Sequence, residues 1–509
     1  MDNLSSSSRK LWEDPLFCSL FLLLLSLLLW FMHNKSKSKL NLPPSPPRLP
    51  IIGNLHQLGS FPSHSLRALS DKYGSLMLLH LGQLTTLVVS SADMVREIAK
   101  NHDLVFSNRP KATATDILFY GGKDIAFASY DECWRQLRKI CVLELLNLKT
   151  VQSFQSVREE EVAKLVDSLR EAAREGSSVN LSQMLNSTSN NIVSRCIFGQ
   201  SNNTEEDGLT MAGDIGRAVL KQLTAFSMGD FFPSLKWIDV LRGFISTLKK
   251  TSELADTFYD RVIEEHMKIK ANGADVTKDF VDVLLQLQRD MHDFELTPVH
   301  LKAIVNDMLV AGIEITATTL EWFMAELLRN PRVLNKTQEE VRRVVGKKGK
   351  VDVNDISSMT YLKCVIKESL RLHPTAPLLL PRETTTNVQI GGYHIPAKTR
   401  VLINAFAIQR DPTVWDKPEE FLPERFENNS LDFRGQHYQL VPFGFGRRQC
   451  PGLTFGTASI EYLVSNLLYW FDWKLPDDAL PEDLDMTQVF GITLTKKTAL
   501  HVVPIPHFP

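Results

Sequence analysis

The sequence predicts a mainly α-helical protein with small β-sheets and a single N-terminal transmembrane helix. Apolar residues recur at the 3.6-residue helical spacing in several long stretches, whereas strand patterns are few and short. An apolar run near the N-terminus contains no charged residue and does not alternate in polarity. The periodic stretches are residues 157–174, 252–271, 299–328, 331–345 and 359–372.

The composition is that of a large globular protein. Its 509 residues include 57 lysines and arginines and 59 aspartates and glutamates, so the formal net charge is −2. This charge excludes a globally basic nucleic-acid binder, and we expect no nucleic-acid partner. Hydrophobic residues make up 43% of the chain, which is enough for a large core. The six cysteines are too few for a disulfide scaffold, and no two have Cys-x-x-Cys spacing.

Residues 15–32 are the predicted transmembrane anchor. As a helix, the apolar run from residue 16 onward is about 25 Å long, at the short end of what spans a bilayer. A cleaved signal peptide is the alternative, but it needs a basic start and a small-residue cleavage site, and neither is present. Lysines at 35, 37 and 39 follow the run. The positive-inside rule then places residues 1–14 in the lumen and the remaining chain in the cytosol, as a single-pass protein of the endoplasmic reticulum membrane.

A hinge and one large domain follow the anchor. Residues 33–50 are first basic and then proline-rich, with five prolines among residues 43–50. Such a segment favours a stiff polyproline spacer. Residues 51–509 have globular composition without a second linker, and we expect one domain. Two short strands, 388–390 and 393–395, flank a Gly-Gly pair and predict a hairpin with a primed turn.

Cys450 has an unusual neighbourhood. It lies in the stretch Phe443-Gly444-Phe445-Gly446-Arg447-Arg448-Gln449-Cys450-Pro451-Gly452, where the glycines allow a tight turn and a close approach of backbone to a flat ligand. Adjacent arginines lower a thiol pKa, and the apolar helix predicted over 453–470 brings its N-terminus near the sulfur. Without further context, a lone cysteine is more often a small core residue.

The context is a set of family motifs. The stretch around Cys450 matches Phe-x-x-Gly-x-Arg-x-Cys-x-Gly, Glu368 and Arg371 match Glu-x-x-Arg, and residues 423–426 match Pro-x-x-Phe. In this order, the motifs resemble the cytochrome P-450 haem-thiolate monooxygenases. The details are most similar to the plant microsomal enzymes of the family 71 clan, and they are residues 50–54, 134–139 and 367–374. The resemblance covers the whole chain and implies the cytochrome P-450 fold, with 51–509 as the haem-thiolate catalytic domain.

The resemblance implies haem b as cofactor, with Cys450 as the axial thiolate that ligates the iron. Electrons would come from NADPH through NADPH-cytochrome P-450 reductase, with cytochrome b5 as an optional second donor. It also implies that Glu368 and Arg371 form a buried network with Arg425. The haem-binding residues implied are Cys450, Phe443 and the propionate partners Trp134, Arg138, Arg382 and Arg448. The expected reductase-docking face carries Arg135, Lys139 and Arg447.

The central helix departs from the family pattern. Ala311-Gly312-Ile313-Glu314-Ile315-Thr316 resembles the motif that crosses the haem, in which Gly312 leaves space for oxygen and Glu314 is the acid that carries protons inward. Position 315 is normally an alcohol, and isoleucine cannot donate a hydrogen bond. We take Glu314 and Thr316 as catalytic with Cys450, although Thr316 is about 100° round the helix. Thr319 is on the face of residue 315, one turn away.

The sequence leaves three functional hypotheses. The first is a membrane-anchored monooxygenase that oxidises a small hydrophobic plant metabolite, a terpenoid, alkaloid or phenylpropanoid, with dioxygen. The second, motivated by Ile315, is oxidative coupling, ring formation, rearrangement or aldoxime dehydration. The third is a catalytically silent membrane protein, which the intact Cys450 motif argues against. By resemblance, the substrate pocket takes residues 111–127, 304–315, 375–380 and 489–492.

Overall fold

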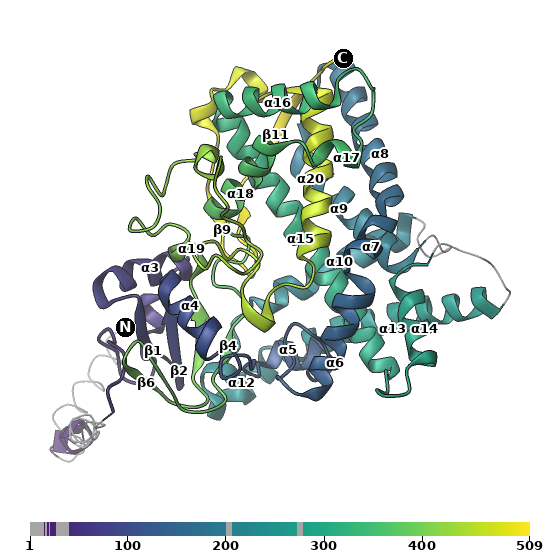
Figure 1. Ribbon diagram of the computed structural model, residues 1–509. Helices are drawn as coiled ribbons and strands as arrows, with labels where there is room; N and C mark the ends of the chain where they lie inside the picture. Colours follow the sequence, from purple (N-terminus) through teal and green to yellow (C-terminus); the bar gives the residue numbers. More distant parts are fainter. Residues whose placement is uncertain are drawn as a thin grey trace, which may run out of the picture.

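A computed structural model gives the fold, and it is mainly helical with small sheets, as predicted (Figure 1). It describes residues 15, 18–19, 21–26, 40–199, 206–271 and 278–508. Figure 1 shows a sheet-containing part beside the N-terminal end of the body and a larger helical part that contains α9, α15 and α20.

The long helices end close to the predicted limits. The stretch predicted over 331–345 is the helix Pro331–Val345, and the one predicted over 453–470 is Leu453–Trp470. The helices Gln155–Glu175 and Phe244–Ala271 begin before the predicted residues 157 and 252. The long helices are α8 (Gln155–Glu175), α9 (Leu181–Phe198), α10 (Glu206–Leu223), α13 (Phe244–Ala271), α14 (Phe280–Asp290), α15 (Pro298–Arg329), α16 (Pro331–Val345), α18 (Thr360–Leu372) and α20 (Leu453–Trp470).

Shorter helices surround this block and carry much of the site. Most begin at a side-chain cap or a proline, as α6 does at Asp131, whose side chain accepts a hydrogen bond from the Trp134 N–H. They are α3 (Pro62–Tyr73), α4 (Ala92–Asn101), α5 (Thr113–Leu118), α6 (Glu132–Ile140), α7 (Leu148–Ser153), α11 (Met228–Phe231), α12 (Lys236–Leu241), α17 (Val353–Ile356) and α19 (Ala405–Ile408), with the π-helix η2 (Cys141–Leu145) and the 3₁₀ turn η6 (Gly446–Arg448).

Four small sheets lie within the described residues. The largest has the strand order β1 (Leu76–Leu81), β2 (Leu84–Val89), β7 (Arg400–Ile403), β4 (Arg382–Glu383), with β2 and β7 parallel and the other pairs antiparallel. The predicted hairpin is confirmed as β5 (Val388–Ile390) and β6 (Tyr393–Ile395), with positive φ at both Gly391 and Gly392. The others are β3 (Val179–Asn180) with β11 (His501–Pro506) and β8 (Phe471–Lys474), and β9 (Gln488–Val489) with β10 (Thr495–Lys496).

Helix α15 is the centre of the helical part. It packs most extensively against α9, and nearly every residue from Thr316 to Leu328 is buried. In the described part of the chain, α15 is the one helix long and apolar enough to cross a bilayer, but 67% of its apolar window is buried inside the protein. It is therefore a core helix, and its extensive burial explains its high content of apolar residues.

The N-terminal prediction falls largely outside the described residues. Of the predicted anchor, the structure describes Pro15, Cys18–Ser19 and Phe21–Ser26, all helical, and the side chains from Phe21 to Leu25 are exposed. Residues 1–14 and the three lysines after the run lie outside the described part. An exposed leucine-rich helix is consistent with a lipid-facing segment, and the anchor stays a prediction.

The proline-rich part of the hinge is docked on the body. Leu78 of β1 donates its N–H to the Pro44 carbonyl at 2.9 Å, and the Asn54 amide donates to the Pro46 and Pro47 carbonyls at 3.4 and 3.3 Å. Asn41 donates its side-chain amide to the Gly392 carbonyl. Residues 41–47 therefore form part of the folded domain, because prolines keep their carbonyls free to accept bonds without offering an N–H.

Candidate active site

Cys450 lies between the turn η6 and the N-terminus of α20. Its N–H donates to the Phe443 carbonyl at 2.9 Å, and Gly452 is the N-cap of α20. The Cys450 side chain is accessible, although protein surrounds it closely enough to desolvate the thiol. Ala311 on α15 is accessible as well, directly after buried Val310. Accessibility in the middle of a packed protein is typical of residues that line an internal hollow.

The cation nearest to the sulfur differs from the prediction. Burial raises the pKa of the Cys450 thiol, while the Gly452 N–H and the charge of Arg138 act in the opposite direction. Arg447 and Arg448 do not contribute as predicted, because the turn η6 directs both side chains away. Arg447 binds the Asp103 carboxylate at 2.7 Å and the Tyr130 hydroxyl at 2.7 Å. The thiol therefore interacts with an arginine from α6 rather than with its sequence neighbours.

Four arginines form a cationic group, here called the arginine cluster. Three were predicted as propionate partners, and Arg109 was missed; the members are Arg109, Arg138, Arg382 and Arg448. They bind backbone carbonyls: Arg448 donates to Ser107 and Ala128 at 2.7 and 2.6 Å. Arg138 donates to the Gln449 carbonyl, next to Cys450. The cluster thus connects α6, β4, the turn η6 and the segment 107–109.

No carboxylate among the described residues is hydrogen-bonded to the arginine cluster, although the charge of buried Asp124 acts on Arg109 and Arg448. Burial, together with the Arg382 charge, lowers the pKa of Arg448 to about 9, and burial lowers that of Arg382 to about 10. The Nη1 atom of Arg382 is buried without a hydrogen-bond partner, and the nearest carboxylate oxygen, on Asp103, is 3.9 Å away. A buried cation with a free donor favours an anionic ligand. The two carboxylates of haem fit this requirement.

Arg109 holds the edges of the cluster together. Its Nη1 donates to the carbonyls of Leu380 and Pro381 at 2.8 Å each, directly before Arg382, and its Nε donates to Ala126 at 2.9 Å. Burial and the charges of Arg448 and Arg382 lower the pKa of Arg109 well below its ordinary value. Its only sequence signal is an arginine before a proline, and its carbonyl partners have no side-chain signature.

The segment 124–128 lies between the arginine cluster and α15. Trp134 donates its indole N–H to the Ile125 carbonyl at 3.0 Å, and Asp307 of α15 accepts the Ile125 N–H at 2.7 Å. Burial raises the pKa of Asp307 well above its ordinary value and that of Asp124 to about 6. Trp134 therefore binds a backbone carbonyl, and its role as a propionate partner stays a prediction. Phe443, the other predicted contact, packs its ring 5.1 Å from that of Phe433.

Glu314 and Thr316 project from different sides of α15. The Glu314 carboxylate accepts a hydrogen bond from the Thr493 hydroxyl. Thr316 faces α9 and α20, among Ser189, Ile192, Val193, Phe455, Ser459 and Leu463. The structure therefore separates this predicted pair.

Glycine 312 and Thr319 have packing roles in this structure. A Cβ on Gly312 would lie 2.9 Å from Val193, so the glycine allows α9 to approach α15 closely. The expected role of leaving space for oxygen stays a prediction. Thr319 donates its hydroxyl to the Ile315 carbonyl at 2.8 Å, so it is engaged with its own helix.

The predicted ionic network is confirmed. Arg371 binds both oxygens of Glu368 at 2.7 and 2.9 Å, and Arg425 binds the same carboxylate at 3.0 Å. The remaining N–H groups of Arg371 donate to the carbonyls of Gln409, Pro418 and Glu420. The side chains of Glu368 and Arg371 are fully buried. Every donor of Arg371 is therefore used, and the network ties α18 to residues 409–425.

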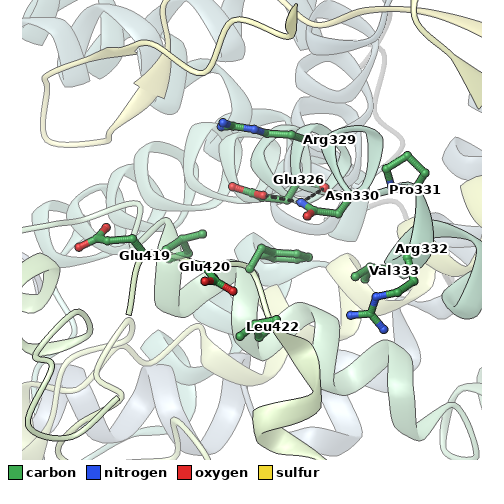
Figure 2. Close-up of a pocket in the computed structure, with 11 residues that line it drawn as sticks. Glu326, Arg329, Asn330, Pro331, Arg332, Val333, Glu419, Glu420 and Leu422 are labelled. Carbon is green, nitrogen blue, oxygen red and sulfur yellow. Dashed lines mark hydrogen bonds between the residues drawn. The ribbon is translucent and has the colours of Figure 1, made fainter. Parts of the chain in front are cut away.

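A polar hollow of about 490 Å³ lies at the other end of α15 (Figure 2). Figure 2 shows Glu326 and Asn330 joined by hydrogen bonds, with Glu419 and Glu420 opposite. Glu326 is about 18 Å along the helix from Glu314, at 1.5 Å per residue. Its carboxylate binds His373 at 2.7 Å. This hollow is therefore separate from Cys450 and from the arginine cluster.

Comparison with known proteins identifies the family. The family model described as Cytochrome P450 matches residues 43–503. The chain is 54% identical to phenylacetaldehyde oxime monooxygenase CYP71AN24 from Prunus mume, over 99% of this chain and 97% of the relative. It is 51% identical to cytochrome P450 71A1 from Persea americana, over 89% of this chain and 91% of the relative. It is 45% identical to 5-epiaristolochene 1,3-dihydroxylase from Nicotiana tabacum, over 96% of this chain and 97% of the relative.

A solved structure of similar fold is a zebra fish cytochrome P450 with progesterone, with a TM-score of 0.76 and 29% identity over 87% of this chain and 99% of that one. The family match includes residues 43–50, in agreement with the docked hinge. The chain belongs to the cytochrome P450 family and is a haem-thiolate monooxygenase that receives electrons from an NADPH-linked reductase.

Proposed function

We propose that this protein is a membrane-anchored monooxygenase that oxidises a small hydrophobic plant metabolite, with Cys450 as the axial ligand of haem b. One observation carries the assignment of the site: a buried arginine cluster with a free donor lies beside an accessible cysteine at a helix N-terminus. Haem held by a thiolate supplies the activation of dioxygen. The chain supplies binding and orientation. Arg138, Arg382 and Arg448 would hold the haem carboxylates, beside Trp134, whose indole N–H is bound to the Ile125 carbonyl, and Phe443 would border the ring.

The ligand assignment is tested with Cys450→Ser. This variant should lose the shifted Soret band of the reduced, carbon-monoxide-bound protein together with all turnover. Cys133→Ser, at a half-buried cysteine on α6, should keep both and is the matched control. A thiolate spectrum in Cys450→Ser would refute the assignment. A wild-type chain without that spectrum would support the silent membrane protein instead.

Glu314 is the proposed distal acid. It is half-buried, and its carboxylate is held by the Thr493 hydroxyl. Thr316 is assigned no direct part in proton delivery, because its side chain lies against α9 and α20. Ile315→Thr separates the two reaction classes. A hydroxylase should gain coupling of NADPH use to product, whereas a coupling or rearrangement enzyme should lose its native product because an unpaired hydroxyl is costly in an apolar site.

An aldoxime substrate is the second candidate. The relative with 54% identity is named a phenylacetaldehyde oxime monooxygenase, and aldoxime chemistry is one of the alternatives that Ile315 favours. The test incubates the full chain and reductase with phenylacetaldehyde oxime under ¹⁸O₂. Monooxygenation places one ¹⁸O atom in the product. Dehydration converts the oxime to a nitrile and water without incorporating ¹⁸O, and no conversion at all would exclude this aldoxime as a substrate.

Membrane attachment is proposed to involve both the anchor and the body. Ile51 is 82% exposed, and Leu49 and Ile52 are exposed beside it at the hinge. Trp237 and Leu241 of α12 are exposed as well. The Ile52 carbonyl accepts the Gly82 N–H, and Gln83 binds the Phe231 carbonyl, so the hinge and the α11–α12 region are adjacent. A chain that begins at residue 35 should bind haem and remain partly membrane-bound. Loss of haem on removal of the anchor alone would contradict this.

The reductase is proposed to dock on the Cys450 side, with cytochrome b5 as an optional donor. Among the predicted cations, Arg135 pairs with Glu132 and Arg447 with Asp103, while exposed Lys139 has no ion pair among the described residues. Lys139→Glu should therefore slow reduction most, and the rate should fall with ionic strength because salt screens exposed charges over about 8 Å. A salt-independent rate would count against docking by these charges.

A further inference from the structure

Glu314 is held by a residue far away in the sequence. Thr493 lies between β9 and β10, is buried, and donates its hydroxyl to Glu314 Oε1. Glu314 itself is half-buried on α15. The contact therefore joins the central helix to the C-terminal loop at the residue proposed as the distal acid.

The loop that carries Thr493 is fixed on both sides of the contact. The next residue, Leu494, donates its N–H to the Thr375 carbonyl at 2.8 Å. Its carbonyl accepts the indole N–H of Trp322, also at 2.8 Å. Trp322 belongs to α15, like Glu314, so the loop is attached to the same helix twice. A Cβ on Gly491 would lie 2.9 Å from the Thr493 carbonyl, and this tight turn further limits where Thr493 can lie.

Two threonines of α15 near Glu314, Thr316 and Thr319, do not bind its carboxylate. Thr319 binds the Ile315 carbonyl, and Thr316 lies against α9 and α20. Position 315 itself has no polar group. In the part of the chain that the structure describes, Thr493 is the one residue that is hydrogen-bonded to the Glu314 side chain.

We propose that Thr493 is the positioning residue of the distal acid, and that it replaces from another element the hydroxyl that position 315 lacks. Its hydroxyl donates to the Glu314 carboxylate and can accept from the protonated acid, so it holds the group in either state. Fixing the donor geometry is what makes proton delivery efficient. The inference rests on the proposed role of Glu314.

The first test needs no turnover. The carboxyl band of Glu314 is identified in the infrared difference spectrum between wild type and Glu314→Gln. Thr493→Val keeps the shape of the side chain and removes the hydroxyl, so this band should shift as the carboxyl loses its donor. Thr493→Ser should restore it. Thr495→Val, at a half-buried threonine of β10, is the matched control and should leave the band unchanged.

The second test measures proton delivery with dioxygen as the only oxidant. Full-length enzyme and reductase oxidise NADPH without organic substrate, and the peroxide formed per NADPH is measured. Peroxide takes two electrons and two protons per dioxygen, whereas full reduction to water takes four of each. Poorer proton delivery should therefore raise the peroxide yield several-fold in Thr493→Val. Thr493→Ser and Thr495→Val should stay near wild type.

A double variant tests whether Thr493 replaces the missing alcohol. Ile315→Thr in the Thr493→Val background should return the peroxide yield toward wild type, and absence of rescue would overturn the replacement. An unchanged band and an unchanged yield in Thr493→Val would overturn the positioning role. A restored band in Thr493→Ser with the yield still raised would overturn the link to proton delivery. If wild type lacks the thiolate spectrum, the proposed function fails, and the infrared test still reports on the contact.

Discussion

The Glu368–Arg371–Arg425 network and the arginine cluster both bury cationic side chains, but among the described residues only the network has a buried carboxylate hydrogen-bonded to its guanidinium groups. In the network, one carboxylate serves two guanidinium groups, and carbonyls take the remaining donors of Arg371. In the cluster, Arg382 keeps a free buried donor, and the arginines lower one another's pKa. Removing one partner of the network would leave a buried charge unpaired, which destabilises the fold. The cluster's buried arginines, without a hydrogen-bonded carboxylate, can instead bind an anionic ligand.

The largest expected effect comes from breaking the Glu368–Arg371–Arg425 network. Arg371→Met leaves Glu368 buried without its partner and should reduce the free energy of unfolding by about 3–5 kcal/mol. Arg332→Met removes a mostly exposed arginine that pairs with Glu424, and it should cost less than about 1 kcal/mol. Urea unfolding of both variants checks this. Equal losses would show that the network is not the stabilising element.

Breaking the arginine cluster should affect the ligand more than the fold. Arg382→Met should weaken haem retention by about tenfold to a hundredfold, which corresponds to the free energy of one hydrogen bond to a charged group. It should destabilise the haem-free chain less than Arg371→Met does, because it removes a buried cation that has no hydrogen-bonded carboxylate. Arg410→Met, at a buried arginine paired with Glu419, is the control and should retain haem normally. Haem transfer to apomyoglobin measures retention. Equal losses in both variants would contradict the ligand-binding role.

The pH dependence near the cluster should have a definite sign. Burial raises the pKa of Asp124 from 3.8 to about 6, so the folded state holds this proton to higher pH than the unfolded state. Its contribution to stability is complete below pH 3.8 and is lost as the pH rises toward about 6. Thermal unfolding across this range should show a steeper decline for wild type than for Asp124→Asn. Parallel curves would mean that Asp124 is ionised throughout.

Glu424, next to Arg425 of the Glu368–Arg371–Arg425 network, should show a smaller effect of pH on stability, with the opposite sign. Burial alone would raise the pKa of Glu424. Hydrogen bonds from Arg332, from the Glu424 N–H and from Tyr361 outweigh burial and lower this pKa from 4.5 to about 2. The stabilisation is present above pH 4.5 and is lost as the pH falls toward 2. Glu424→Gln should flatten this acid-side decline in a thermal unfolding series. A variant that declines as steeply as wild type would assign the acid sensitivity to other groups.

Features encoded within short segments were predictable, and contacts between distant segments were not. Glu368 and Arg371 lie one turn apart on a helix, and Cys450 lies in a continuous motif, so both were found from the sequence. Arg109 was missed because its partners are backbone carbonyls that any residue supplies. Thr493 was missed because 179 positions separate it from Glu314.

Proximity in sequence was also misleading at two places. Arg447 and Arg448 are neighbours of Cys450, but a 3₁₀ turn points their side chains toward Asp103 and toward the carbonyls of 107 and 128. Thr316 is two residues from Glu314, but that spacing turns it to another side of α15. The helix periodicity predicted the elements well because burial imposes it directly, whereas the rotamers and turns that aim single side chains depend on the assembled fold.

The docked proline segment has a consequence for orientation on a membrane, given the proposed anchor over residues 15–32. Since residues 41–47 are bonded to β1, β6 and Asn54, at most residues 33–40 separate the proposed anchor from the folded body. A connection of so few residues restricts the tilt that the body can adopt against the lipid plane. Inserting a flexible glycine-serine stretch at 38–39 should therefore broaden the distribution of haem tilt angles measured by linear dichroism in oriented bilayers, whereas an insertion within 43–47 should also open the edge of the β1 sheet and promote aggregation.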